Sequence, residues 1–288
     1  MRRQKEQDGV EHTQSPHALF AQFLIAFGLI SGAIQFAGQV FGVRFAEPGL
    51  VTGLSLAACL AWAIFKAFPR RHAGRAFDYP DISIEIRVGD ILESDTDIVV
   101  GFCDTFDTDT TDDIVINGAS LQGQLLQRTY ENDRRRLDDD LARALSEYSP
   151  IKVETKTTKP QGKLMRYAIG TVAVIGSPKR RIYCVAYSRM GNDLTARCSI
   201  DDFWMSLGKL WTAIGARGQL NAVAVPIMGA ELARVYALDR ENLLKVIILS
   251  FVASSRVRPV CRELTVIIRP DDIETVDMLE MQAFLAAL

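Results

Sequence analysis

The sequence predicts an α/β fold, with a mixed sheet covered by helices on both faces, preceded by two transmembrane helices. Two observations predict this organisation. Nearly all of the long uncharged sequence lies before residue 70, where it forms two apolar runs. From residue 78 onward, short runs rich in β-branched residues alternate with segments of helical periodicity. At 288 residues, the chain is long enough to bury a sizeable core.

The charge and cysteine content argue against several functions. A net charge of -2, with 24% charged residues, provides no basic surface of the kind that binds nucleic acid, so we expect no nucleic-acid partner. The cysteines are scattered without the paired spacing of metal ligands, which predicts reduced thiols, no disulfide framework and no metal site. They are Cys59, Cys103, Cys184, Cys198 and Cys261.

Two apolar runs predict a transmembrane hairpin. Residues 18–43 contain no charged residue and are long enough, as a helix, to cross the roughly 30 Å hydrocarbon core. A second run, residues 49–65, extends through a snorkelling Lys66 to residue 68. A cleaved signal peptide is the alternative, but the first run is too long and lacks a small-x-small cleavage site. We expect residues 1–75 to form the hairpin and residues 76–288 a separate domain.

Basic residues flank both ends of this hairpin. They are Arg2, Arg3 and Lys5 before the first run, and Lys66, Arg70, Arg71 and Arg75 after the second. Because cytoplasmic flanks carry an excess of Lys and Arg, both flanks should be cytoplasmic. The pattern predicts a multi-pass membrane protein whose termini and domain lie in the cytosol.

One face of the first run carries small and amide residues at helical spacing. This glycine-glutamine stripe consists of Gly28, Gly32, Gln35, Gln39 and Gly42. Small residues let helix backbones approach closely in lipid, and a glutamine amide in hydrocarbon needs a partner. The stripe should therefore contact a helix. That helix is either the second one of the same chain, near Gly53 and Ala57, or the same stripe in another copy.

The rest of the chain alternates between expected strands and expected helices. The strands are residues 82–88, 97–103, 151–157, 169–175, 181–187, 221–228 and 263–269. The helices are residues 120–130, 133–148, 199–217, 240–255 and 273–288. This alternation is typical of a mixed sheet covered on both faces, which binds ligands at the carboxyl ends of its strands.

Residues 101–124 follow one such strand and end in residues suited to phosphate. Ser120 is a candidate N-cap, and Gln122 to Gln124 then present first-turn amides of the kind that hold phosphate oxygens. A helix cap alone also explains the serine. The acidic part of this segment would repel phosphate, so we expect one or two of its carboxylates to bind ribose hydroxyls or a cationic group. These carboxylates are Asp104, Asp107, Asp109, Asp112 and Asp113.

Residues 226–234 leave another strand through a glycine turn. Gly229 makes the turn, and Arg234 could then meet a diphosphate bidentately. An ordinary left-handed turn followed by a solvated arginine is the alternative.

The order of several motifs resembles a macro domain. Residues 86–91 (IRVGDI), followed by a strand at residues 97–100, match its opening. Residues 104–108 (DTFDT), 120–124 (SLQGQ), 186–188 (AYS) and 226–234 (PIMGAELAR) then follow in order. With the two leading apolar runs, nearly the whole chain resembles the membrane-macro effector of type II Thoeris antiphage systems.

The resemblance implies which residues bind the ligand. In this family the aspartate of the Gly-Asp-Ile turn contacts the adenine amino group, so the role passes to Asp90, with Ile91 against the base. The candidate ligand-binding residues are Asp90, Ile91, Cys103, Asp104, Phe106, Asp107, Ser120, Gln122, Gly123, Gln124, Tyr187, Gly229, Ala230, Glu231, Leu232 and Arg234.

The resemblance also implies an antiphage defence effector of abortive infection in the bacterial inner membrane. A partner TIR-domain enzyme would make a histidine conjugate of ADP-ribose, which the macro domain would bind. The helices would then oligomerise and disrupt the membrane lipid. The ligand is an ADP-ribose derivative, and no cofactor is implied. The oligomer size, the choice between a pore and general disruption, and the route of the signal stay open.

The alternative function is a membrane-anchored ADP-ribosyl hydrolase. His12, His17 and His72 all lie in or beside the membrane region, so the expected pocket has no imidazole to act as a base. Asp104 could activate water and Cys103 could attack, but neither has an orienting partner in the sequence. The chain also lacks the Asn-Ala-Ala-Asn segment and the Gly-Gly-Gly-Val loop of ordinary macro domains. We therefore expect a receptor rather than an enzyme.

Overall fold

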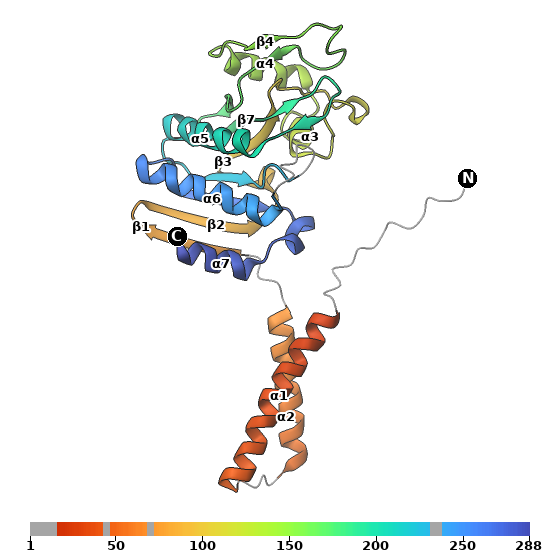
Figure 1. The fold of residues 1–288 in the computed structure, drawn as a ribbon, viewed down its shortest axis with the longest axis vertical. Helices are drawn as coiled ribbons and strands as arrows, with labels where there is room; N and C mark the ends of the chain where they lie inside the picture. The colour runs from red at the N-terminus through yellow and green to blue at the C-terminus, as the bar shows by residue number, and fades with distance from the viewer. Residues whose placement is uncertain (1–15, 43–46, 68–71, 231–237) are drawn as a thin grey trace, which may run out of the picture. The chain divides into compact units, whose positions relative to one another are not determined.

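The chain divides into two compact units. The structure, a computed structural model, describes residues 16–42, 47–67, 72–230 and 238–288 (Figure 1). The two units are Met1–Arg70 and Arg71–Leu288. This division falls before the expected boundary at residue 75, because a strand of the second unit already begins at His72.

The first unit contains a helical hairpin. Its helices are α1 (Pro16–Phe41) and α2 (Pro48–Ala67). Within α1, the 19-residue stretch Phe23–Phe41 is long and apolar enough to cross a membrane. The apolar stretch of α2, Gly49–Ala63, is shorter than a typical span. The second transmembrane helix therefore stays a prediction.

The glycine-glutamine stripe lies outside the contact between these two helices. Ala26 of α1 and Cys59 and Ala63 of α2 are buried, whereas every residue of the stripe is exposed. A methyl group added at either of its first two glycines would meet no atom within 4 Å. Gly53 and Ala57 are exposed as well. Packing of the stripe on the second helix, one of the two alternatives, is therefore not what the structure shows.

The second unit is built around one sheet, in the order β1-β2-β10-β9-β3-β7-β6, with β8 paired to β7. The strands from β2 to β7 in this order run parallel, and β1 and β6 are antiparallel edges. The strands are β1 (His72–Asp78), β2 (Asp81–Val88), β3 (Asp97–Cys103), β6 (Val172–Ser177), β7 (Arg180–Met190), β8 (Ala196–Arg197), β9 (Val223–Pro226) and β10 (Glu263–Ile268). A separate two-stranded ladder joins β4 (Lys152–Val153) to β5 (Met165–Arg166).

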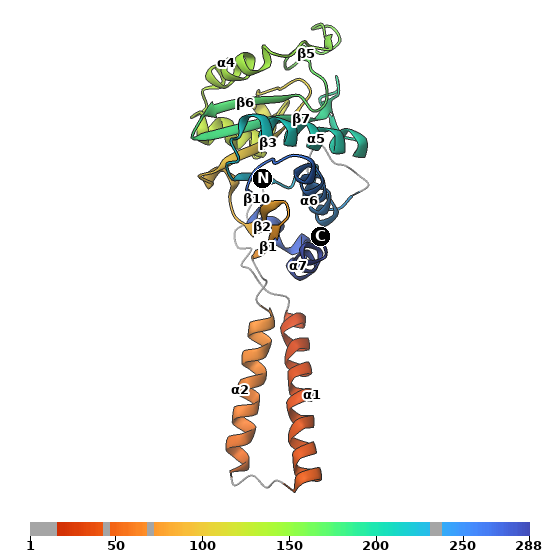
Figure 2. The same cartoon turned by 90° about the vertical axis from the view of Figure 1, so that its left-hand side faces the viewer.

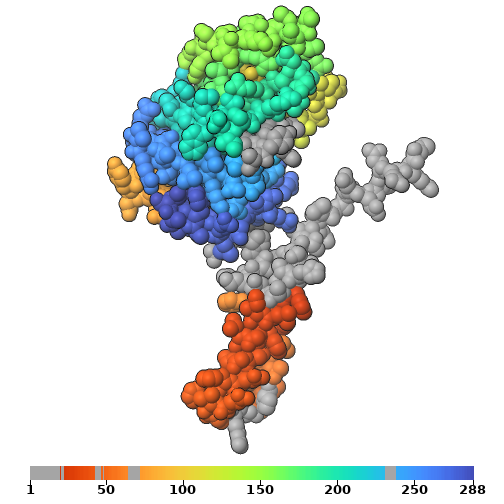
Figure 3. Space-filling view, in the orientation of Figure 1, coloured from red at the N-terminus to blue at the C-terminus, as the bar shows by residue number. Residues whose placement is uncertain are grey.

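Helices cover both faces of this sheet, as the sequence predicts (Figure 1, Figure 2). Alternate strand residues point to opposite faces, so Val99 packs against one helical layer and Val100 against the other. The first layer contains α5 (Ile200–Arg217), α6 (Arg240–Val257) and α7 (Met278–Ala287). Figure 3 shows these helices covering the side of the domain that faces the viewer. The second layer contains α3 (Leu121–Gln124), the π-helical turn η3 (Leu125–Thr129) and α4 (Arg134–Leu145).

Three short 3-10 segments complete the described elements. They are η1 (Ile91–Glu93), η2 (Thr111–Asp113) and η4 (Pro270–Thr275). The structure differs from the sequence-based elements mainly at two strands. It adds β1, whose Gly, Arg and Asp residues have low strand propensity and which forms by pairing with β2. It reduces the expected strand at residues 151–157 to β4, because that segment pairs only with the short β5.

Candidate functional site

A cavity of about 610 Å³ lies at the carboxyl ends of the parallel strands. Residues that follow β2, β3, β9 and β10 converge on it, together with the end of β7. Strands of one direction end at one edge of a sheet, where side chains beyond the last hydrogen bond are free to meet a ligand. Its volume is within the range of small-molecule sites, about 300–1,000 Å³.

Eight of the sequence-predicted ligand residues line this cavity. They are Asp90, Ile91, Cys103, Ser120, Gln122, Gln124, Tyr187 and Gly229. Glu231, Leu232 and Arg234 lie outside the described residues. Ala230 packs against the core below the glycine turn.

Asp90 is held in place at the end of β2. Its Oδ1 accepts a hydrogen bond from Leu92 N at 2.9 Å, which caps η1, and its Oδ2 forms an ion pair with Arg128. Arg128 comes from the π-helical turn η3, which follows α3. The carboxylate keeps unused lone pairs, so it can still accept a hydrogen bond from a ligand.

Gly123 shapes the cavity wall without lining it. Ser120 Oγ accepts from Gly123 N at 3.1 Å and donates to Asn117 O at 2.6 Å, closing the turn before α3. A Cβ at position 123 would lie 2.5 Å from Gly118 O and 2.6 Å from Asn117 O. Contrary to the prediction, Gly123 does not line the cavity. Its missing side chain instead lets the backbone of the wall approach α3.

Cys103 is a poor nucleophile in this setting. Its side chain is 7% exposed at the end of β3, and Ser188 Oγ donates to its Sγ at 3.2 Å. Burial raises the pKa of the Cys103 thiol to about 12. The thiol is therefore protonated near neutral pH, so Cys103 lines the cavity as a neutral thiol and not as a nucleophilic thiolate.

Three further predicted ligand residues, Asp104, Phe106 and Asp107 of the acidic loop, do not line the cavity. The Phe106 ring is fully buried, with its centroid 5.6 Å from that of Phe102 and 5.7 Å from that of Tyr167. Asp104 and Asp107 are 3% and 1% exposed.

Both buried carboxylates are paired with cations from the segment after α4. Asp104 Oδ2 accepts from Arg166 Nη1 at 2.8 Å, and its Oδ1 accepts from Met190 N at 2.8 Å. Asp107 Oδ2 accepts from Lys159 Nζ at 3.1 Å. Neither carboxylate is therefore available to bind a ribose hydroxyl or a cationic group of the ligand. Asp113 of the same loop does line the cavity, where its Oδ1 accepts from Gly118 N at 2.6 Å.

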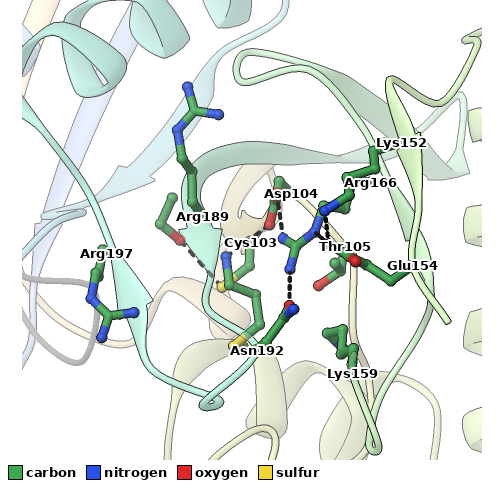
Figure 4. Close-up of polar contacts among 12 residues, drawn as sticks. Cys103, Asp104, Thr105, Lys152, Glu154, Lys159, Arg166, Arg189, Asn192 and Arg197 are labelled. Carbon is green, nitrogen blue, oxygen red and sulfur yellow. Dashed lines mark hydrogen bonds and ion pairs between the residues drawn. The ribbon is translucent and has the colours of Figure 1, made fainter. Parts of the chain in front are cut away.

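Arg166 organises this buried network from its centre (Figure 4). Besides Asp104, it donates to Glu154 Oε1 at 2.7 Å and to Asn192 Oδ1 at 2.8 Å. Hydrogen bonds from Lys152 and Arg166 lower the pKa of Glu154 to about 2. Because residues 194–196 line the cavity, the contacts of Arg166 hold the start of the loop that forms one of its walls.

Arg240, Arg269 and Asp272 were missed by sequence reasoning although they line the cavity. Asp272 Oδ2 accepts from Arg240 Nη1 at 3.0 Å and from Arg269 Nε at 3.1 Å. Residues 269–272 directly follow β10, so the rule that ligands bind at the carboxyl ends of strands could have found them. Arg240 is the first residue of α6, and no local sequence pattern identifies it as a cavity residue.

Comparison with known proteins identifies one family. A family model described as "Thoeris protein ThsA, Macro domain" matches residues 84–269. No curated protein matches the chain.

Several solved structures are similar at low sequence identity. A mutant macrodomain of Oceanobacillus iheyensis is 13% identical, with a TM-score of 0.43, covering 76% of this chain and 98% of that chain. The macrodomain of the same organism with ADP is 14% identical, with a TM-score of 0.41 and the same coverage. A tomato leucine aminopeptidase mutant is 18% identical, with a TM-score of 0.38, covering 70% of this chain and 36% of that chain.

Proposed function

The chain belongs to the Thoeris protein ThsA macro domain family, and we propose on that basis that it is a receptor for an ADP-ribose-derived signal in antiphage defence. The observation that carries the proposal is the cavity of about 610 Å³ at the carboxyl ends of the strands. In this proposal, a TIR-domain partner supplies the ligand, a histidine conjugate of ADP-ribose. Binding then makes the N-terminal helices self-associate and disrupt the membrane.

The polar residues of the cavity support this ligand class. Arg240 and Arg269 offer guanidinium groups, which match the geometry of phosphate oxygens. Asp90 and Asp113 offer carboxylate oxygens, which accept hydrogen bonds from amino and hydroxyl groups. A nucleoside diphosphate sugar carries both anionic and hydrogen-bond-donating groups, so it complements both sets.

Calorimetry on the full-length protein in lipid nanodiscs tests the binding. We expect ADP-ribose and its histidine conjugate to release or absorb heat on mixing, with saturable binding, and AMP to bind at least tenfold more weakly because it lacks the second phosphate and the distal ribose. The absence of saturable heat with both ADP-ribose compounds would contradict the proposal.

We further propose that the domain binds this ligand without breaking it down. Among the described residues that line the cavity there is no histidine, and the Cys103 thiol is protonated at neutral pH because burial raises its pKa to about 12. Incubation with ADP-ribosylated protein should therefore release no ADP-ribose beyond a no-protein control. Catalytic release would favour the alternative, a membrane-anchored ADP-ribosyl hydrolase.

The exposed glycine-glutamine stripe supports self-association of the helices. In the described part of the hairpin both of its glutamine side chains are exposed, and an unpartnered amide is costly in hydrocarbon. A second copy of the stripe would satisfy them. This part of the proposal includes both spans, with the two flanks on the cytoplasmic side of the inner membrane.

Replacing Gln35 and Gln39 together with leucine should weaken ligand-dependent cross-linking in membranes about tenfold. Interhelical hydrogen bonds in lipid contribute about 0.6 kcal/mol each on average, and the double variant removes two amide groups per copy, so the loss is about 1.2 kcal/mol, or roughly tenfold. The matched control is Ser55→Ala, whose hydroxyl already donates to Val51 O of its own helix at 2.7 Å. Unchanged oligomers in the double variant would show that the stripe is not the interface.

A further inference from the structure

The strand that continues from the hairpin begins at the cavity edge of the sheet. α2 ends at Ala67 and β1 begins at His72, with residues 68–71 between them. His72 pairs with Arg87 near the end of β2, and Gly89, two residues further on, lines the cavity. Because a strand advances about 3.3 Å per residue and paired strands lie about 5 Å apart, His72 starts within about 12 Å of the cavity wall.

Helix α7 holds the outer edge of this strand through Gln282. Gly74 N donates to Gln282 Oε1 at 3.1 Å, and Gln282 Nε2 donates to Gly74 O at 3.1 Å. The side-chain amide therefore occupies the position that a neighbouring strand would otherwise take on this edge. These two hydrogen bonds join α7 directly to the backbone of β1.

Arg75 makes a second connection between α7 and β1. Its Nη1 donates to Leu285 O and to Ala286 O, both at 2.6 Å. The last carbonyls of a helix lack intrahelical partners and carry partial negative charge, so a guanidinium stabilises them. Successive residues of β1 are thus bonded to α7, one through its backbone and one through its side chain.

The other end of α7 is continuous with the cavity wall. Residues 269–272 line the cavity, and η4 leads from them to Asp277, the N-cap of α7. Within η4, Thr275 Oγ1 donates to Asp272 O at 2.6 Å. Asp277 N also donates to Glu241 Oε2 of α6 at 3.2 Å. The connection between the cavity wall and α7 is therefore short and internally hydrogen-bonded.

A buried carboxylate keeps this wall in place. Asp272 is 9% exposed, and both of its guanidinium partners, Arg240 and Arg269, line the cavity. An anion bound in the cavity would compete with Asp272 for these groups, because guanidinium pairs bidentately with phosphate as well as with carboxylate. The structure shows the arrangement with both guanidinium groups on Asp272. An anion bound to them in place of Asp272 would give the wall a second arrangement.

We infer that α7 couples occupancy of the cavity to the strand that bears the membrane hairpin. An anionic ligand draws Arg240 and Arg269 away from Asp272, η4 shifts, and α7 moves the start of β1 through Gln282 and Arg75. This coupling rests on the proposed function and specifies how its site is regulated. A ligand shifts an equilibrium only if it binds the two arrangements unequally, and the competition at Asp272 supplies that difference.

Hydrogen exchange on the wild-type, full-length protein in nanodiscs tests the coupling without any substitution. Saturating ADP-ribose, or its histidine conjugate if only that compound binds, should change the exchange rates of amides in β1 and α7 at least threefold. The edge strand β6 at the opposite side of the sheet is the internal control and should keep its rates. Unchanged rates in β1 with the cavity occupied would overturn the inference.

Substitution of Gln282 provides the second test. Gln282→Leu removes both hydrogen bonds to Gly74 at similar side-chain size, and ligand affinity should stay within about twofold while ligand-dependent cross-linking of the hairpins falls at least fivefold. Ala283→Leu places the same side chain at the next, exposed position of α7 and should respond like the wild type. Arg75→Gln should reproduce the loss through the other connection.

These experiments separate the coupling from the receptor itself. If the wild type binds neither ADP-ribose compound, the proposed function fails and the coupling fails with it. If it binds them but Gln282→Leu and Arg75→Gln both cross-link like the wild type, the coupling is wrong and the receptor stands. If a variant does not fold, the exchange experiment on the wild type decides.

Discussion

Replacing Lys159 with methionine should lower the free energy of unfolding of the ligand-binding domain by about 3–5 kcal/mol. The side chains of Lys159 and Asp107 are both fully buried, with Nζ and Oδ2 3.1 Å apart. Methionine fills a similar volume but leaves the Asp107 carboxylate without its cation in a site closed to water. Thr105 Oγ1 still donates to Asp107 at 2.5 Å, but a hydroxyl does not neutralise the charge.

Urea unfolding of the full-length protein in detergent, followed by tryptophan fluorescence, measures this effect. Lys179→Met is the matched control, because Lys179 is exposed in the turn between β6 and β7, and it should change stability by no more than about 0.5 kcal/mol. If Lys159→Met lowers the free energy of unfolding by less than about 1 kcal/mol, the buried Asp107 carboxylate does not need its cation and the ion pair contributes little to stability.

Replacing Gly123 with alanine should weaken binding of ADP-ribose about thirtyfold, which corresponds to about 2 kcal/mol. The new Cβ would lie 2.5 Å from Gly118 O and 2.6 Å from Asn117 O, and backbone atoms cannot rotate away as a flexible side chain can. The wall at Asn117 and Ser120 must shift, and both of these residues line the cavity. Affinity falls because the preformed site is lost, even though Gly123 itself does not line it.

Calorimetry on Gly123→Ala and on Gly208→Ala checks this expectation. Gly208 lies in α5, away from the cavity, and an added methyl group there would meet no atom within 4 Å. Gly208→Ala should bind like the wild type and gain up to about 1 kcal/mol of stability from the higher helix propensity of alanine. Equal affinity of Gly123→Ala and the wild type would contradict the role of the close backbone approach.

Most of the sheet could be predicted because its signals are local. The apolar run at residues 97–103 matches β3, and the run at residues 263–269 matches β10 to within one residue. The expectation that residues after strands form the site predicted Cys103 and Gly229, and the resemblance predicted Asp90; all three line the cavity. The strand β1 escaped prediction because its stability comes from pairing with β2 and from the contacts of Gln282 rather than from its own propensity.

The sequence by itself determined the α/β class, the family and the apolar N-terminal segment, because each of these depends on short-range pattern or on motif order. Only the tertiary structure decided which charges face the cavity. Asp104 pairs with Arg166, 62 positions along the chain, and Asp107 with Lys159, 52 positions along. Pairing at such separations depends on how the backbone folds. It produces no periodic pattern in the sequence from which the partner could be predicted.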